Sequence, residues 1–184
     1  MFEAALLDLL FQKLNDMKRN VWVYGLVLGA VLCIPWLIMV KMLYTNPEFK
    51  SHDLLGYAIL VVIYSLIFFG IRNYRQKALD GVISFGQAFK TGALITLVAA
   101  TLYLFVWLFF YFFFIPDFME VFTQHVLYQC TSEEELAAKT IEMENFNRMY
   151  QNPLLMILLT YAEVLPIGLV VSLISALILK NKKT

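Results

Sequence analysis

Residues 91–115 read TGALITLVAATLYLFVWLFFYFFFI and contain no charged side chain. A helix needs about 20 consecutive apolar residues to cross a hydrocarbon core about 30 Å thick, so this stretch is long enough to span a bilayer. Three further apolar stretches, at residues 21–40, 54–71 and 154–179, match or approach that length. The sequence therefore predicts an all-α polytopic membrane protein with four transmembrane helices in a bundle.

The composition supports the same class of protein. Hydrophobic residues make up 61% of the 184 residues and charged residues only 15%, whereas soluble domains are about half apolar and a quarter charged. The four stretches occupy nearly half of the chain, which leaves no room for a separate soluble enzyme domain. We expect residues 20–184 to form one transmembrane domain.

Basic residues are unequally shared between the two sides that this topology creates. Ten of the fourteen Lys and Arg residues fall on one side: Lys13, Lys18, Arg19, Arg72, Arg75, Lys77, Lys90, Lys180, Lys182 and Lys183. The positive-inside rule then predicts that both termini are cytoplasmic, and we expect a bacterial inner membrane. The excess of basic charge favours contact with anionic lipid at the inner leaflet, and nucleic acid is not an expected partner.

Ahead of the first stretch, residues 1–19 have apolar side chains at helical spacing, such as Leu6, Leu10, Leu14 and Met17. This spacing predicts an amphipathic helix lying on the inner leaflet. The alternative is that Met17 is the natural start and that the preceding residues are an upstream extension.

The connection before residues 91–115 contains the run GVISFGQAFK at residues 81–90. Ser84 followed three residues later by Gln87 is typical of a capping box, so a helix should begin there. Phe85 and Phe89 lie on one face of that helix at headgroup depth, and Lys90 can meet lipid phosphates. We interpret this segment as an interfacial elbow in preference to a ligand-binding site.

The connection at residues 116–152 predicts an external helical hairpin between the third and fourth transmembrane helices. Pro116 can open its first helix, and Ser132 with Glu135 forms a second capping-box pattern. Asn152-Pro153 should end the second helix. The apolar stripes of this hairpin can be buried on the bundle or against another protein, and we favour the bundle.

Glu163 is the ionisable side chain placed deep within a predicted span. It lies nine residues after Leu154, or about 13 Å along a helix that rises about 1.5 Å per residue. Such a residue marks a functional site by default, although a protonated carboxyl bonded to a neighbouring helix explains it equally well. Matching depths along the other spans predicts a polar pocket containing Glu163, Trp36, Tyr103 and Trp107, with Lys41 as the counter-ion.

Small residues recur at four-residue spacing in two predicted spans. The first contains Gly25 and Gly29, and the fourth contains Gly168, Ser172 and Ala176. Such spacing allows close approach of helix backbones, so these two spans are expected to pack together or onto another subunit.

The run GVISFGQAFK, the preceding RNYR at residues 72–75 and the later PDFM at residues 116–119 together resemble the bacterial membrane-protein family catalogued as domain of unknown function 4199. The resemblance extends over roughly residues 18–180. It implies a small integral inner-membrane protein of several spans and supplies no catalytic residues.

Motifs for chemistry are missing from this sequence. His52 and His125 have no companions at metal-ligand spacing, and there is no nucleophile elbow, phosphate loop or cofactor motif. We therefore expect a non-enzymatic membrane component, without metal or cofactor, that binds lipids, a protein partner or a second copy of itself. The alternative is a small transporter or permease-like subunit that uses Glu163 as a proton- or cation-responsive site.

Overall fold

The computed structural model describes residues 2–46, 49 and 53–181. Within them the chain forms seven helices: α1 (Phe2–Thr45), α2 (Asp53–Tyr64), α3 (Leu66–Ala78), α4 (Phe85–Phe113), α5 (Phe118–Tyr128), α6 (Glu133–Tyr150) and α7 (Pro153–Leu179). Four stretches are long and apolar enough to cross a membrane: Phe11–Thr45, Leu55–Ala78, Phe85–Phe113 and Pro153–Leu179. The predicted all-α membrane fold with four spans and an external hairpin is confirmed.

The second span is made of two helices, α2 and α3, separated by Ser65. The Ser65 hydroxyl donates a hydrogen bond to the Val62 carbonyl at 2.6 Å, and the Phe68 amide donates to the Ser65 carbonyl at 3.0 Å. The helix is interrupted at this one residue, where the serine hydroxyl competes with backbone amides for the Val62 carbonyl.

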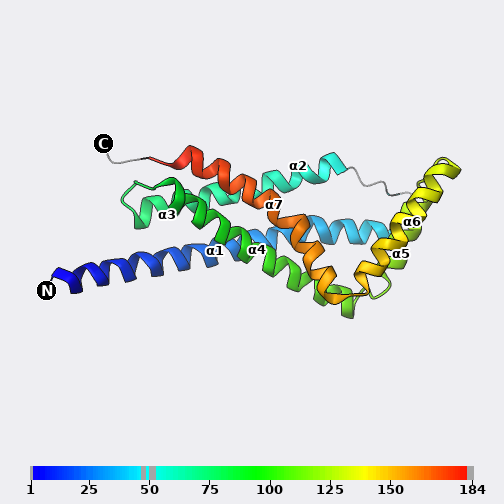
Figure 1. Cartoon of the computed structure of the whole chain (residues 1–184), viewed down its shortest axis with the longest axis horizontal. Coiled ribbons are helices and arrows are strands. Elements are labelled where there is room, and N and C mark those ends of the chain that lie inside the picture. The colour runs from blue at the N-terminus through cyan, green and yellow to red at the C-terminus, as the bar shows by residue number, and fades with distance from the viewer. Residues whose placement is uncertain (1, 47–48, 50–52, 182–184) are drawn as a thin grey trace.

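Both described ends of the chain lie at the same end of the bundle as the connection from α3 to α4 (Figure 1). The hairpin of α5 and α6 covers the opposite end. We call the end with the termini the inner end and the end with the hairpin the outer end.

Helix α4 is the centre of the bundle, and α1, α3 and α7 all pack against it. A Cβ atom added at Gly29 of α1 would lie 2.9 Å from the Ala99 carbonyl of α4, and one added at Gly168 of α7 would lie 2.3 Å from Cγ2 of Thr96. The prediction that the two small-residue stripes meet each other is therefore wrong. Each stripe packs on α4, where Gly25 and Gly29 meet Val98, Ala99 and Leu102, and Gly168 meets Thr96.

Two hydroxyl groups join α4 to α7 within this contact. Thr96 and Ser172 are fully buried, and their oxygen atoms lie 3.2 Å apart. Each oxygen atom also lies within hydrogen-bond distance of a carbonyl of its own helix, that of Gly92 for Thr96 and that of Gly168 for Ser172. Because each hydroxyl carries one proton, one of the two donates across the contact while the other donates within its own helix. Because water cannot satisfy polar groups in the hydrocarbon core, this pairing removes a penalty that unpaired hydroxyls would impose.

Helix α1 continues without a break from Phe2 through Thr45. The predicted interfacial helix at residues 1–19 is thus the inner part of the same helix as the first span. No proline or glycine lies between residues 1 and 24 to end it. Met1 and the side chains of residues 2–6 and 8–10 are outside the described part of the structure, while the side chains of Leu7, Phe11 and Leu14 are exposed.

The outer hairpin is attached to the bundle at its first residues. Asp117 accepts a hydrogen bond of 2.8 Å from the Tyr44 hydroxyl at the end of α1, so its carboxylate does not cap α5. Ser132 caps α6 by accepting from the Glu135 amide, as predicted, but the Glu135 carboxylate accepts from Thr131 instead of completing a reciprocal box. Asn152 ends the hairpin by capping α7, with Pro153 in the first turn.

Burial of the hairpin against the bundle is partial. Phe118, Met119 and Met143 are buried. Phe122 and Phe146 pack against an apolar cluster that contains Phe118, Met119 and Trp107. By contrast, Tyr128, Leu136 and Ile141 remain exposed. The expected self-burial therefore applies to the part of the hairpin nearest the spans.

At the inner end, one side chain ties the C-terminal end of α7 to the connection between α3 and α4. The Asn181 side chain accepts a hydrogen bond from the Ile83 amide and donates one to the Gly81 carbonyl, each at 3.0 Å, and the Asn181 amide donates to the Ile83 carbonyl. Asp80 and Gly81 have φ values of 51° and 80°, which form a turn between α3 and α4. Ile83 itself is fully buried.

We expect Gly168→Ala to lower the free energy of unfolding by about 1–3 kcal/mol, because the added methyl group overpacks the contact with Thr96 and Tyr64. Equilibrium unfolding in a mild detergent measures this change. Gly86→Ala is the matched control, since a Cβ there meets nothing within 4 Å. Equal stabilities for the two variants would contradict the close contact.

We expect Asn181→Ala to speed amide hydrogen exchange across residues 79–84, because the buried Ile83 amide loses its acceptor at a cost of about 1–3 kcal/mol. Hydrogen exchange followed by mass spectrometry checks this outcome. Lys180→Ala, at the exposed neighbouring position, should exchange as the parent protein does. Unchanged exchange in Asn181→Ala would rule out the proposed tie.

Candidate functional site

A cavity of about 660 Å³ lies between the outer halves of the spans and the hairpin. Four of its aromatic side chains come from the spans: Trp36 on α1, Tyr57 on α2, and Tyr103 and Trp107 on α4. Four more come from the hairpin: Phe118, Phe122, Phe146 and Tyr150. Helix α7 contributes Leu159, Thr160, Ala162 and Glu163. The cavity falls within the range of about 300–1,000 Å³ that is usual for small-molecule sites.

The structure brings together four of the five residues predicted to form an intramembrane site. Glu163, Trp36, Trp107 and Tyr103 all line this cavity, although they come from three different helices. The sequence indicated that these residues lie at a similar depth in the bundle, and the structure shows that their side chains also line the same cavity.

Lys41, the predicted counter-ion, is not among the lining residues. It is exposed, and neither of the two ion pairs among the described residues includes it. Successive residues of an α-helix are rotated by about 100°, so Lys41 points about 140° away from Trp36, five residues earlier on α1. Lys41 and Glu163 were matched by depth alone, and Lys41 points away from the cavity. The predicted ion pair therefore does not form.

The rings beside Glu163 meet edge to face. Trp36 lies 5.3 Å from Trp107 and 6.4 Å from Tyr103, measured between ring centroids, with interplanar angles of 83° in both pairs. Trp107 makes a further perpendicular contact with Phe118 at 5.0 Å, which joins the span to the hairpin. Edge-to-face pairs of this kind are favourable, and they turn neighbouring ring faces in different directions.

Glu163 is exposed to the cavity and makes no hydrogen bond or ion pair with any described residue. The alternative expectation of a carboxyl bonded to a neighbouring helix therefore has no contact to support it in the described chain. Burial raises the pKa of the nearby Tyr150 phenol, and the charge of Glu163 raises it further. Tyr150 thus presents a neutral hydroxyl group to the cavity.

Pro166 lies one turn beyond Glu163 in α7, and the helix continues through it. A proline removes one backbone donor and disturbs the preceding turn. In that turn the Val164 carbonyl accepts a hydrogen bond of 2.8 Å from the hydroxyl of the fully buried Tyr64. This contact fixes the part of α7 that carries Glu163 against the second span.

The predicted interfacial motif lies at the inner end, far along α4 from the cavity. Ser84 and Gln87 form the reciprocal capping box: the Ser84 hydroxyl accepts from the Gln87 amide, and the Gln87 side chain accepts from the Ser84 amide. The rings of Phe85 and Phe89 stack with an interplanar angle of 7°, and Lys90 is exposed. This confirms the local geometry expected of the elbow.

Two polar residues of the inner end were not singled out from the sequence. Asn181 bonds to the connection before α4, and the Arg75 guanidinium donates to the Leu179 carbonyl at 3.1 Å. An asparagine directly after a long apolar helix is a common helix-ending signal, but it does not reveal which distant backbone groups it meets.

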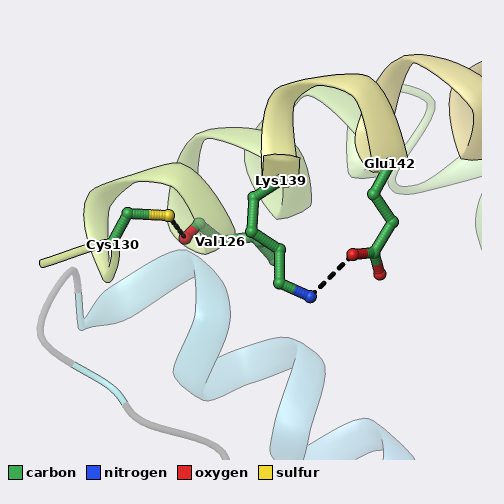
Figure 2. Close-up of polar contacts among 4 residues, drawn as sticks. All are labelled: Val126, Cys130, Lys139 and Glu142. Atoms are coloured by element: carbon green, nitrogen blue, oxygen red, sulfur yellow. Dashed lines mark hydrogen bonds and ion pairs between the residues drawn. The ribbon is translucent and has the colours of Figure 1, made fainter. Parts of the chain in front are cut away.

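Polar side chains on the surface of the hairpin make hydrogen bonds and an ion pair with residues three or four positions away in the sequence. Figure 2 shows the ion pair of Lys139 with Glu142, at 2.7 Å within α6, and the Cys130 thiol donating to the Val126 carbonyl. Hydrogen bonds from Thr131 lower the pKa of the Glu135 carboxyl, and the bond to Glu142 raises the pKa of Lys139. Among the described residues, no group of three or more His, Cys, Asp or Glu could hold a metal ion.

Comparison with known proteins finds a match to the family described as "Protein of unknown function (DUF4199)", whose model matches residues 23–181. No curated protein and no solved structure matches the chain. The matched region contains most of the first span, the other three spans, the cavity, the elbow and the outer hairpin. The chain therefore belongs to the DUF4199 family of proteins of unknown function.

Proposed function

We propose that this protein is a non-enzymatic membrane component that binds a lipid or a similar amphiphile in the cavity beneath its outer hairpin. The observation that carries this proposal is the cavity itself, which is walled by aromatic rings from the spans and the hairpin and has one carboxyl group at its side. Ligand sites typically combine such an apolar lining with a few polar groups that fix the orientation of the ligand.

The inner half of the bundle supports binding in a closed-ended site. Below the cavity, Tyr64, Ile67 and Ile95 are fully buried, and the contact between Thr96 and Ser172 fills the space between α4 and α7. A packed interior of this kind excludes water and solutes. A ligand that enters the cavity from the outer half therefore meets a floor of packed side chains.

The wall formed by α2 supports an amphiphile as the ligand. Gly56, Tyr57 and Leu60 line the cavity, while Leu55, Val61 and Val62 on other faces of the same helix are exposed. Large apolar side chains exposed on a membrane span face lipid tails. One helix therefore separates the cavity from the surrounding lipid, and at Gly56 that helix carries no side chain.

The lining offers binding groups in preference to reacting groups, which is why no reaction is assigned. Its described residues include one carboxyl group, and the Thr160 hydroxyl beside it donates to the Met156 carbonyl of its own helix. Nucleophilic catalysis requires a group that activates the nucleophile, and the described lining residues contain no pair of hydrogen-bonded side chains that could do so. We propose neither a metal nor a cofactor for this site.

A transport role is the second candidate, and one observation favours it. Glu163 faces a cavity within a span that also contains Pro166, and broken or strained helices beside ionisable residues are common in transporters. Transport would require the packed inner half to open, whereas binding requires no such change. Binding is therefore the simpler explanation of the same residues.

A second kind of partner would fit the outer surface of the hairpin. Tyr128, Leu136 and Ile141 are large apolar side chains that remain exposed there. Another protein or a second copy of this chain could cover them, which agrees with the sequence-based expectation of a protein partner. Nothing in the proposed function requires nucleic acid.

For the location we propose a bacterial inner membrane with both termini in the cytoplasm. The described ends of the chain and the connection between α3 and α4 lie at the inner end of the bundle (Figure 1), and Lys18, Arg19, Arg75 and Lys180 belong to these parts of the sequence. That end would then face the anionic lipids of the cytoplasmic leaflet.

We expect Gly56→Leu to reduce the lipid retained after purification in a mild non-ionic detergent by about fivefold or more, which corresponds to about 1 kcal/mol of binding free energy. The new side chain enters the cavity, and a Cβ at Gly56 meets nothing within 4 Å, so the fold should be unaffected. Mass spectrometry of the intact complex counts the bound lipid.

Gly86→Leu is the matched control for this experiment, because Gly86 also has open space around it but lies at the inner end, away from the cavity. It should retain as much lipid as the parent protein. Equal retention by Gly56→Leu and Gly86→Leu would show that the cavity does not hold the lipid.

We expect a reporter fused after Thr184 to be active only when it is of the type that functions in the cytoplasm, because the positive-inside rule places the basic inner end there. Paired fusions of a periplasm-active and a cytoplasm-active reporter measure this. Activity of the periplasmic reporter alone would reverse the proposed orientation.

A further inference from the structure

We propose that the group recognised beside Glu163 is an organic ammonium, so that the occupant of the cavity is an amphiphile with a cationic head. This inference rests on the proposed binding of an amphiphile and adds the chemistry of the head group. It follows from the charge, the ring geometry and the dimensions of the same cavity.

The charge of the cavity is unbalanced. Among the described residues that line it, Glu163 is the only carboxylic acid and there is no lysine, arginine or histidine. Both ion pairs of the described chain lie elsewhere, one at Asp16 with Arg19 and one within α6. A carboxylate in an apolar setting is costly unless a cation accompanies it, so the missing charge is one that a ligand can supply.

Three aromatic rings that line the cavity together with this carboxyl group have an arrangement that suits a cation without strong hydration. Trp36 stands perpendicular to both Trp107 and Tyr103, which makes adjoining walls instead of a stack. The face of an aromatic ring carries negative electrostatic potential, and tryptophan attracts cations most strongly. Quaternary and alkylated ammonium groups are the ligands that aromatic cages of this kind bind in other proteins.

The dimensions favour an amphiphile over a free cation. An ammonium head needs only a small part of a cavity of about 660 Å³, and the remaining lining is largely apolar, with Phe118, Phe122 and Phe146 above and Leu60 on the lipid-facing helix. An alkyl chain attached to the head would cover these surfaces and gain the free energy of burying them.

The experiment compares three probes that separate head from chain: decyltrimethylammonium, 1-decanol and tetramethylammonium. Trp36 and Trp107 line the cavity and serve as fluorescent reporters, while the third tryptophan, Trp22, is exposed on α1 and is removed by Trp22→Phe. Titrations use the full chain carrying Trp22→Phe in dodecyl maltoside micelles. Each probe is tested on this protein and on versions that also carry Glu163→Gln or Glu144→Gln.

We expect decyltrimethylammonium to bind about tenfold more tightly than 1-decanol, since a cation–π contact with charge pairing is worth about 1–2 kcal/mol. It should also bind more tightly than tetramethylammonium, which has no alkyl chain to bury. Glu163→Gln should remove most of the advantage of decyltrimethylammonium over 1-decanol. It should leave the affinity for 1-decanol unchanged, which also shows that the variant is folded. Glu144→Gln removes an exposed carboxylate from the hairpin and should bind all three probes as the parent does.

Four outcomes would overturn the inference. Equal affinities for decyltrimethylammonium and 1-decanol, or an unchanged preference in Glu163→Gln, would refute recognition of the ammonium while leaving amphiphile binding intact. Tetramethylammonium binding as tightly as decyltrimethylammonium would assign the cavity to a free cation. Failure of both decyl probes to bind would remove the proposed function itself.

Discussion

The close contact of α4 with α1 and α7 is the constraint on which the remainder of this structure depends. Within a bilayer the lipid tails are as apolar as the helices, so association relies on tight packing and on hydrogen bonds between helices. Here Gly29 and Gly168 allow the backbones of α1 and α7 to approach α4, and the hydroxyl groups of Thr96 and Ser172 meet between α4 and α7. A larger side chain at either glycine would collide with α4. The two glycines must therefore face α4, which fixes the rotation of α1 and α7 about their own axes.

The same helix helps to explain why the inner half of the bundle is tightly packed while the outer half contains a cavity. Along α4, the buried residues of the inner half are mostly small, such as Gly92, Thr96 and Ala99, whereas those of the outer half include Leu104 and Trp107. Small side chains hold helices close, and bulky rings hold them apart while packing only edge to face. The rings do not fill the wider outer space completely, and the hairpin of α5 and α6 covers what they leave. The change in side-chain size along this helix therefore agrees with a packed inner half and a cavity in the outer half.

The position of Glu163 at the cavity explains how a stable fold can contain an ionisable residue within a span, where burying its charge would be unfavourable. An acidic side chain facing lipid or a dense core would have to lose its charge or find a partner. Lining an open cavity instead gives the carboxyl group access to whatever enters, while Tyr64 and Pro166 define the turn of α7 that carries it. A binding role accounts for the aromatic walls, the carboxyl group and the thin wall of α2 with a single assumption. A transport role would need the closed inner half to move as well.

The sequence by itself determined the class of the protein, the four spans, the hairpin and several helix starts, such as those at Ser84 and Ser132. Each of these depends on local patterns of hydrophobicity or on contacts three residues apart, which are visible in one dimension. It also indicated the depths of Glu163, Trp36, Tyr103 and Trp107, because depth follows from counting residues along a helix. Only the tertiary structure decided that both glycine stripes meet α4, that Lys41 turns away from Glu163, and that Asn181 reaches Ile83. Those outcomes depend on how each helix is rotated about its axis and which neighbour it faces, and that choice is made jointly by all the side chains in contact.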